Sequence, residues 1–243
     1  KYGDNVSAKH HHLIRDVESC YLSSSLAVDL AKKYNSDLHV FHLTTEKEMD
    51  LFSAGAIDGK KITSEVCVHH MFFNETYYSK LGNQIKCNPS IKTESDRLAL
   101  IKSLLDDKID IIATDHAPHT IEEKRSDNPP SGLPGVETMV PLMLNEVSEG
   151  RLKLERLVNA MSEAPATRLG LERGKIVEDQ TADFMIVDMK KSLPIKLDRL
   201  HSKSNWTPFE NWPAIFPSQV YRRGELIAEH GEIKQEAGGQ NLF

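Results

Sequence analysis

The sequence predicts an α/β protein that combines half of a TIM-like (β/α)8 barrel, about four βα units, with a small β-sandwich-type domain. Strand patterns alternate with helix patterns at the spacing of parallel βα units, and each expected strand runs into polar residues. After residue 168 the pattern changes to short β-rich pieces. We therefore expect residues 1–168 to form the half barrel and residues 169–243 to form the small β-rich domain.

The first βα elements are expected between residues 16 and 52. Residues 16–34 carry apolar side chains at helical spacing and predict an amphipathic helix. Residues 38–43 predict a short strand. Thr45 and Glu48 have the spacing of a helix cap, so a helix should follow that strand.

Three further strands are expected before residue 114. They cover residues 62–68, residues 85–87, which give a weaker pattern, and residues 109–113. Thr93 and Asp96 predict the cap of the helix that precedes the last of these strands. The strands of the small domain are expected at residues 182–188, 219–222 and 225–229, with an ordered loop at 206–217.

The polar residues that follow the strands are His42, His69, His70, Asn88 and Asp115. Because the carboxyl ends of all strands of such a barrel converge on one mouth, these side chains should share a pocket. Asp115 is the strongest candidate for a general base beside a metal-bound water. The alternative is that Asp115 caps a helix or pairs with a lysine or arginine.

The histidines allow two interpretations each. His42 is either a metal ligand or a core histidine bonded to backbone, and His119 either binds an anionic substrate group or satisfies its own loop. His69 and His70 resemble zinc donors, but adjacent strand residues point to opposite faces, so the structural interpretation is favoured for them. Residues 10–12 are expected to lie in a solvent-exposed loop. Asn88 either donates to substrate or belongs to an ordinary turn.

Composition sets bounds on the partners. The 243 residues are 39% hydrophobic and 27% charged, with a net charge of −6, so the chain lacks the basic surface that nucleic acid requires. No long apolar run or signal-peptide pattern is present, which argues against a membrane span or secretion and favours the cytoplasm. Three cysteines without paired spacing predict free thiols. The start at Lys1 favours a longer protein.

Several segments together closely resemble the dihydroorotases, which belong to the amidohydrolase superfamily. The segments are residues 39–45, Asn88-Pro89, residues 113–119 (ATDHAPH), residues 122–124 (EEK) and residues 132–138 (GLPGVET). The ATDHAPH run followed by EEK and GLPGVET separates dihydroorotases from hydantoinases and allantoinases. The resemblance covers nearly the whole chain and identifies it as the carboxyl-terminal half of the barrel.

The resemblance implies zinc-dependent, reversible cyclisation of N-carbamoyl-L-aspartate to (S)-dihydroorotate and water, in pyrimidine biosynthesis. It implies two zinc ions (Zn²⁺) per complete active site, a small-molecule substrate and a homo-oligomer as one possible assembly. The implied roles are metal binding by His42, metal binding and general-base catalysis by Asp115, and substrate binding by Asn88, His119, Ser131 and Gly132. The position of His70 is not a ligand in the family.

The chain also departs from the family pattern. On their first four strands, dihydroorotases carry an HxH pair followed by arginine, a bridging aspartate or carboxylated lysine, and a further histidine in an HxE-type motif. None of these occurs here, because residues 10–12 (HHH) have the wrong context and position. The remaining zinc ligands should therefore lie outside this chain, and the chain alone should neither hold two zinc ions nor turn over. Two rivals are a non-catalytic, dihydroorotase-like scaffold subunit and another cyclic amidohydrolase of the hydantoinase or allantoinase type. Retention of Asp115 and His119 speaks against the scaffold.

Overall fold

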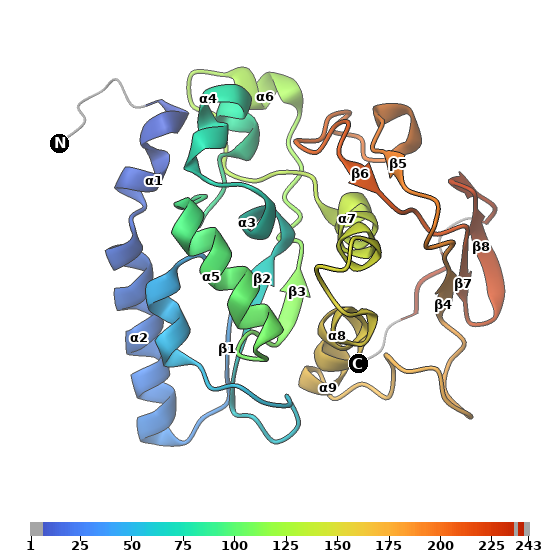
Figure 1. The fold of residues 1–243 in the computed structure, drawn as a ribbon, viewed down its shortest axis with the longest axis horizontal. Helices are drawn as coiled ribbons and strands as arrows, with labels where there is room; N and C mark the ends of the chain where they lie inside the picture. Colours follow the sequence, from blue (N-terminus) through green and yellow to red (C-terminus); the bar gives the residue numbers. More distant parts are fainter. Residues whose placement is uncertain (1–6, 236–237, 241–243) are drawn as a thin grey trace.

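The computed structural model describes residues 7–235 and 238–240. Its centre is a parallel sheet of β1 (Leu38–Val40), β2 (Ile62–Cys67) and β3 (Ile111–Ala113), in that spatial order (Figure 1). Leu38 pairs with Ile62, and Cys67 pairs with Ala113. Because all three strands run in the same direction, their carboxyl ends lie on one edge of the sheet.

Two of the expected strands differ from the structure. The strand expected at 38–43 ends at Val40, and His42 has a φ of 42°, a left-handed conformation that a strand does not accommodate. The strand expected at 85–87 is wrong, because Gly82–Ile85 forms a 3-10 turn and the Lys86 amide bonds back to the Asn83 carbonyl. β2 instead pairs directly with β3.

Helices cover the sheet and connect its strands. The two longest before β3 are α2 (Val17–Tyr34) and α5 (Glu94–Leu105), and α7 (Val136–Ser148) lies between the parallel sheet and the carboxyl-terminal strands (Figure 1). The shorter helices are α1 (His11–Ile14), α3 (Val68–Phe72), α4 (Tyr78–Leu81), α6 (Ile121–Arg125), α8 (Leu154–Val158) and α9 (Ala164–Arg168). None of the described helices is long and apolar enough to cross a membrane.

Side-chain caps fix where the helices begin. The Asp16 carboxylate accepts from the Ser19 amide at the start of α2. Thr93 and Asp96 form the expected capping box of α5. Thr45 accepts from the Glu48 amide as expected, although the element that follows, Glu46–Leu51, is a 3-10 helix.

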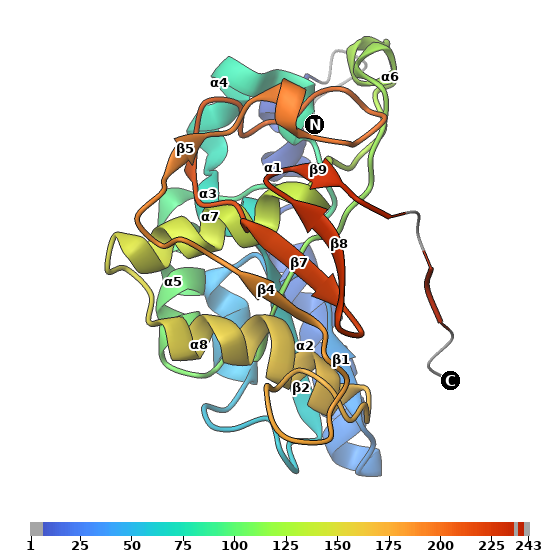
Figure 2. The same cartoon turned by 90° about the vertical axis from the view of Figure 1, so that its right-hand side faces the viewer.

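Two antiparallel sheets follow α9 in the sequence. The larger consists of β4 (Phe184–Ile186), β7 (Gln219–Arg222), β8 (Glu225–Glu229) and β9 (Glu232–Ile233), and the smaller of β5 (Leu193–Pro194) and β6 (Pro213–Ala214) (Figure 2). The strands expected within 182–188, 219–222 and 225–229 are confirmed. The sandwich-type arrangement stays a prediction.

An aromatic cluster joins the carboxyl-terminal segment to the rest of the molecule. The ring of Phe209 stacks on Phe73 with 4.8 Å between centroids, and Trp212 meets both rings edge-on. Ile195 and Ile215 are fully buried in the same core as β2 and α5. The division after residue 168 therefore separates two stretches of chain that share one core, and as a domain boundary it stays a prediction.

We expect Phe209→Ala to lower the free energy of unfolding by about 3–5 kcal/mol, because it removes a fully buried ring and leaves a cavity. Phe41→Ala is the matched control, since that ring is 62% exposed, and its effect should stay within about 0.5 kcal/mol. Urea denaturation followed by circular dichroism measures both. Equal effects would show that the carboxyl-terminal segment does not contribute to the core.

Candidate active site

The carboxyl edge of the parallel sheet carries the residues of the candidate site. His42 follows β1, His69 follows β2 within the first turn of α3, and Asp115 follows β3. Since β2 lies between β1 and β3, His69 occupies the middle of this row. The edge therefore presents two imidazoles and a carboxylate, the group types that bind zinc.

The backbone is strained at both ends of the row. His42 has a φ of 42° and Asp115 a φ of 44°, and both residues lie in the left-handed region that non-glycine residues rarely adopt. Each such conformation costs free energy, and it persists only where the surrounding structure holds it.

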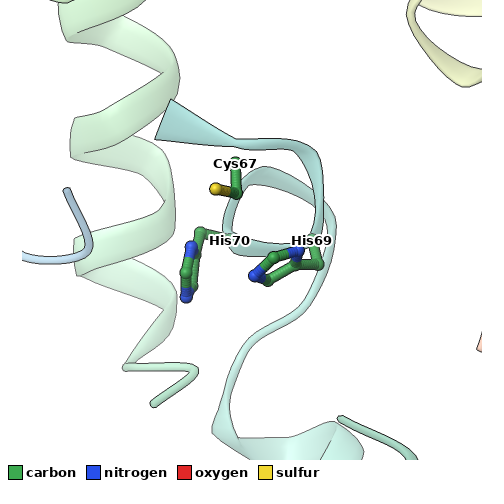
Figure 3. Close-up of side chains that lie close together, drawn as sticks. All are labelled: Cys67, His69 and His70. Atoms are coloured by element: carbon green, nitrogen blue, oxygen red, sulfur yellow. The ribbon is translucent and has the colours of Figure 1, made fainter. Parts of the chain in front are cut away.

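His69 and His70 both turn into the protein. The expectation that their side chains point to opposite faces is wrong, because β2 ends at Cys67 and the two histidines lie on a helical turn. Their ring centroids are 4.2 Å apart, and Figure 3 shows both rings beside Cys67. The two-residue period of a strand therefore does not apply to His69 and His70, which follow the period of a helix.

Burial keeps both imidazoles neutral. Desolvation lowers the pKa of His69 to about 3, with a smaller contribution from the neighbouring His42. The pKa of His70 also falls well below its ordinary value, first because of burial and then because of His69. The influence of His42 on His69 indicates that the side chains that follow β1 and β2 lie close together.

Three buried ring nitrogens at this edge have no hydrogen-bond partner among the described residues. They are His42 Nδ1, His69 Nε2 and His70 Nδ1. Buried polar atoms are nearly always paired, and an unprotonated imidazole nitrogen is the form that binds zinc. The unpaired nitrogens therefore fit a metal ion. His70 is the most constrained, because its Nε2 already donates to the Pro89 carbonyl at 3.0 Å.

Cys67 adds a thiol to the same place. The ligand atoms of Cys67, His69 and His70 all lie within 4.8 Å of one another, so this buried group has the dimensions of a metal site (Figure 3). Burial, and then the charges of Glu65 and Asp115, raise the pKa of the thiol. The contribution of Asp115 indicates that its carboxylate lies near Cys67.

His11 supports the segment that contains Asn88. The expectation that residues 10–12 form an exposed loop is wrong, because His10 ends a 3-10 helix, His11 and His12 belong to α1, and none of the three is exposed. His11 is buried and donates from Nε2 to the Cys87 carbonyl at 2.8 Å. The Asn88 side chain also bonds to His11. Asn88 itself is exposed.

His119, Ser131 and Gly132 are brought together as a unit. His119 donates from Nε2 to the Ser131 carbonyl at 3.2 Å. Gly132 has a φ of 130°, and a Cβ at this position would lie 2.6 Å from the Cβ of Ala117, so only glycine fits. In addition, the indole of Trp206 donates to the His119 carbonyl at 2.7 Å.

The amidohydrolase family profile matches residues 23–227, which cover the parallel sheet, the row of site residues and most of the antiparallel strands. The chain belongs to the amidohydrolase family. The family assignment gives no role to any single residue.

Relatives of this amidohydrolase chain carry the name dihydroorotase. The protein from Archaeoglobus fulgidus is 37% identical over 219 residues, which span 90% of this chain and 51% of the relative. The protein from Methanosarcina mazei is 35% identical over 246 residues, which span 96% of this chain and 54% of the relative. This chain spans about half the length of the curated relatives it matches.

Solved amidohydrolase structures share the fold. The L-hydantoinase of Arthrobacter aurescens superposes with a TM-score of 0.81 at 26% identity, over 88% of this chain and 49% of the hydantoinase. The mixed α/β architecture of the family is therefore confirmed for the chain. The described parallel sheet consists of β1, β2 and β3, and its closure into a barrel stays a prediction.

We expect the metal-free chain to lose stability as the pH falls from about 6.5 toward about 3. An unfolded histidine titrates near 6.5, whereas folded His69 titrates at about 3, so only the unfolded chain gains a proton between these values. The contribution of His69 is complete above pH 6.5 and declines below it. Urea unfolding in EDTA should show a shallower acid decline for His69→Gln than for the wild type. Parallel pH curves would contradict this account.

Zinc should bind the described chain through the unpartnered histidines. We expect His42→Ala and His69→Gln each to weaken zinc binding by roughly tenfold or more. Loss of a residue that only hydrogen-bonds to a metal ligand already lowers metal affinity by at least about tenfold, and loss of a ligand should cost at least as much. His230→Asn, a change on an exposed turn between β8 and β9, is the control. Competition with a chromogenic chelator measures the affinity. Binding that is unaffected by both site variants would place the metal elsewhere.

Proposed function

We propose that this chain is the carboxyl-terminal half of a dihydroorotase, which interconverts N-carbamoyl-L-aspartate and (S)-dihydroorotate plus water in pyrimidine biosynthesis. The observation that carries the proposal is the pair of buried, unpartnered nitrogens, His42 Nδ1 and His69 Nε2, at the sheet edge where Asp115 follows β3. Identities of 34–37% to proteins named dihydroorotase support the choice of reaction.

Two zinc ions are expected in the complete active site. His42 and His69 would hold one of them, Asp115 would contact the other, and residues outside this chain would supply the remaining ligands. Bound zinc would polarise the ring carbonyl and lower the pKa of water. The sequence predicted His42 as the only histidine ligand in this chain, and the proposal adds His69. The thiol of Cys67 lies within 4.8 Å of the ligand atom of His69.

Asp115 is the proposed general base. Its carboxylate is exposed at the end of β3, where it can reach both water and a bound ring. During hydrolysis it accepts the proton of the attacking water and delivers it to the ring nitrogen as the C–N bond breaks. Ring closure follows the reverse path, with Asp115 taking the proton from the nitrogen.

Asn88, His119, Ser131 and Gly132 are the proposed substrate contacts. Asn88 offers an exposed amide, and the segment at residues 131–132 is joined to His119. A histidine and an amide donor are suited to an anionic substrate group such as a carboxylate. As part of this proposal, the enzyme acts in the cytoplasm on a small molecule and forms a closed barrel with an upstream half.

A hydantoinase-type activity is the second candidate. It is favoured by the superposition on the Arthrobacter aurescens L-hydantoinase. The identity in that comparison is 26%, compared with 37% for the Archaeoglobus fulgidus dihydroorotase, so sequence supports the first candidate more strongly.

The test is a chimera in which this chain replaces the matched portion of the Methanosarcina mazei dihydroorotase, assayed with zinc. We expect hydrolysis of dihydroorotate, and we expect Asp115→Asn to lower kcat by roughly 10²–10⁴-fold because the general base is lost. Asp127→Asn, a change in an exposed loop, should leave the rate unchanged. The chain alone should not turn over.

The alternatives give different outcomes. Turnover of hydantoin or dihydrouracil without turnover of dihydroorotate would replace the proposal with the hydantoinase-type activity. A folded, zinc-loaded chimera that is inactive on all three compounds would indicate a non-catalytic scaffold.

A further inference from the structure

Lys124 is a buried cation in α6. Its side chain is 1% exposed, and no carboxylate among the described residues forms an ion pair with it. Burial of an ammonium group is costly unless its donors are satisfied. The Thr120–Glu123 capping box fixes the start of α6 and therefore the direction from which Lys124 enters the interior.

Backbone carbonyls satisfy the ammonium group. Lys124 Nζ donates to the carbonyls of Lys86, Pro130 and Gly132 at 3.1, 2.9 and 2.8 Å. An ammonium group has three donors, so all of its hydrogen-bonding capacity is used. The desolvation of this site lowers the pKa of Lys124 to about 8, with Cys87 opposing the shift and Lys86 adding to it.

The carbonyls come from the two segments that carry proposed substrate contacts. Lys86 lies two residues before Asn88, while Pro130 and Gly132 flank Ser131. The Gly132 amide donates to the same Lys86 carbonyl at 2.9 Å, so Lys124 reinforces an existing link between the segments. On the other side, Ser131 is tied to His119.

Trp206 lies beside both Lys124 and His119. Its ring centroid is 6.0 Å from Lys124 Nζ, and its Nε1 donates to the His119 carbonyl. A cation over an aromatic face is stabilised, more so when it is desolvated. Lys124 therefore contacts the ring of Trp206 and bonds to the backbone of two other segments, at Lys86 and at residues 130–132.

We propose that Lys124 is a positioning residue for substrate binding, because its three hydrogen bonds to carbonyls fix the Ser131–Gly132 backbone relative to Asn88 and His119. This inference rests on the proposed function. Lys124 does not touch the substrate in this arrangement, and its effect is transmitted through the backbone. Loss of its bonds should release residues 129–133 while leaving the sheet edge with His42, His69 and Asp115 intact.

The first test measures the backbone in the chain itself. Lys124→Met retains an unbranched apolar stem but removes the donors, so hydrogen exchange of the Gly132 amide should accelerate by roughly tenfold or more, the equivalent of one hydrogen bond. Lys124→Arg should restore part of the protection because it keeps a charged donor. Lys108→Met is the control, because Lys108 bonds to a single distant carbonyl, that of Met49. Unchanged exchange in Lys124→Met would overturn the inference.

The second test separates positioning from stability in the chimera. Looser substrate contacts weaken ground-state and transition-state binding alike, so Lys124→Met should raise KM for dihydroorotate by roughly tenfold with little change in kcat. A merely structural role would reduce the fraction of folded enzyme and lower apparent kcat at constant KM. Lys124→Arg should recover part of the KM, and Lys108→Met should match the wild type.

The outcomes distinguish the two proposals. An active wild-type chimera with an unchanged KM in Lys124→Met overturns the role of Lys124 alone. An inactive wild-type chimera overturns the proposed function, and the positioning role falls with it even if hydrogen exchange shows that Lys124 holds the loop.

Discussion

Parallel pairing of β1, β2 and β3 is the constraint on which the site depends. It points the carboxyl ends of three strands to one edge, so His42, His69 and Asp115 follow strands that end there, although they are far apart in the sequence. A reversed strand would send its polar residue to the opposite edge. The left-handed backbone at His42 and Asp115 ends both strands at the level of the site and turns the chain away from the sheet.

Hydrogen bonds from side chains to backbone carbonyls join the loops above this edge. Lys124, His119 and Trp206 each donate to a carbonyl of another segment, so loops distant in sequence share one network. Such bonds fix the orientation of the backbone in each segment. Phe209 packs against Phe73 in the shared core, and Trp206 in the same segment bonds to the His119 carbonyl. The carboxyl-terminal region therefore helps to position the loop that contains His119.

The sequence predicted the parts of the fold that depend on local pattern. Strong alternation and capping pairs located β2, β3, α5 and the antiparallel strands. The weak pattern at 85–87 failed because turn bonds at Asn83 compete with strand pairing. The sequence did not predict His69 as a metal ligand, because its pattern predicts a strand where the chain turns into a helix. Burial of His11 and Lys124 depends on contacts between distant segments, which a single sequence does not reveal.

The position of Trp206 has an optical consequence. The chain contains only two tryptophans, and the other, Trp212, lies among the rings of the aromatic core. The indole of Trp206 touches the carbonyl of His119 and faces the ammonium group of Lys124. Its fluorescence is therefore sensitive to charge and hydration around His119 and Lys124, so the molecule contains an intrinsic probe of changes beside the proposed substrate contacts that needs no added dye.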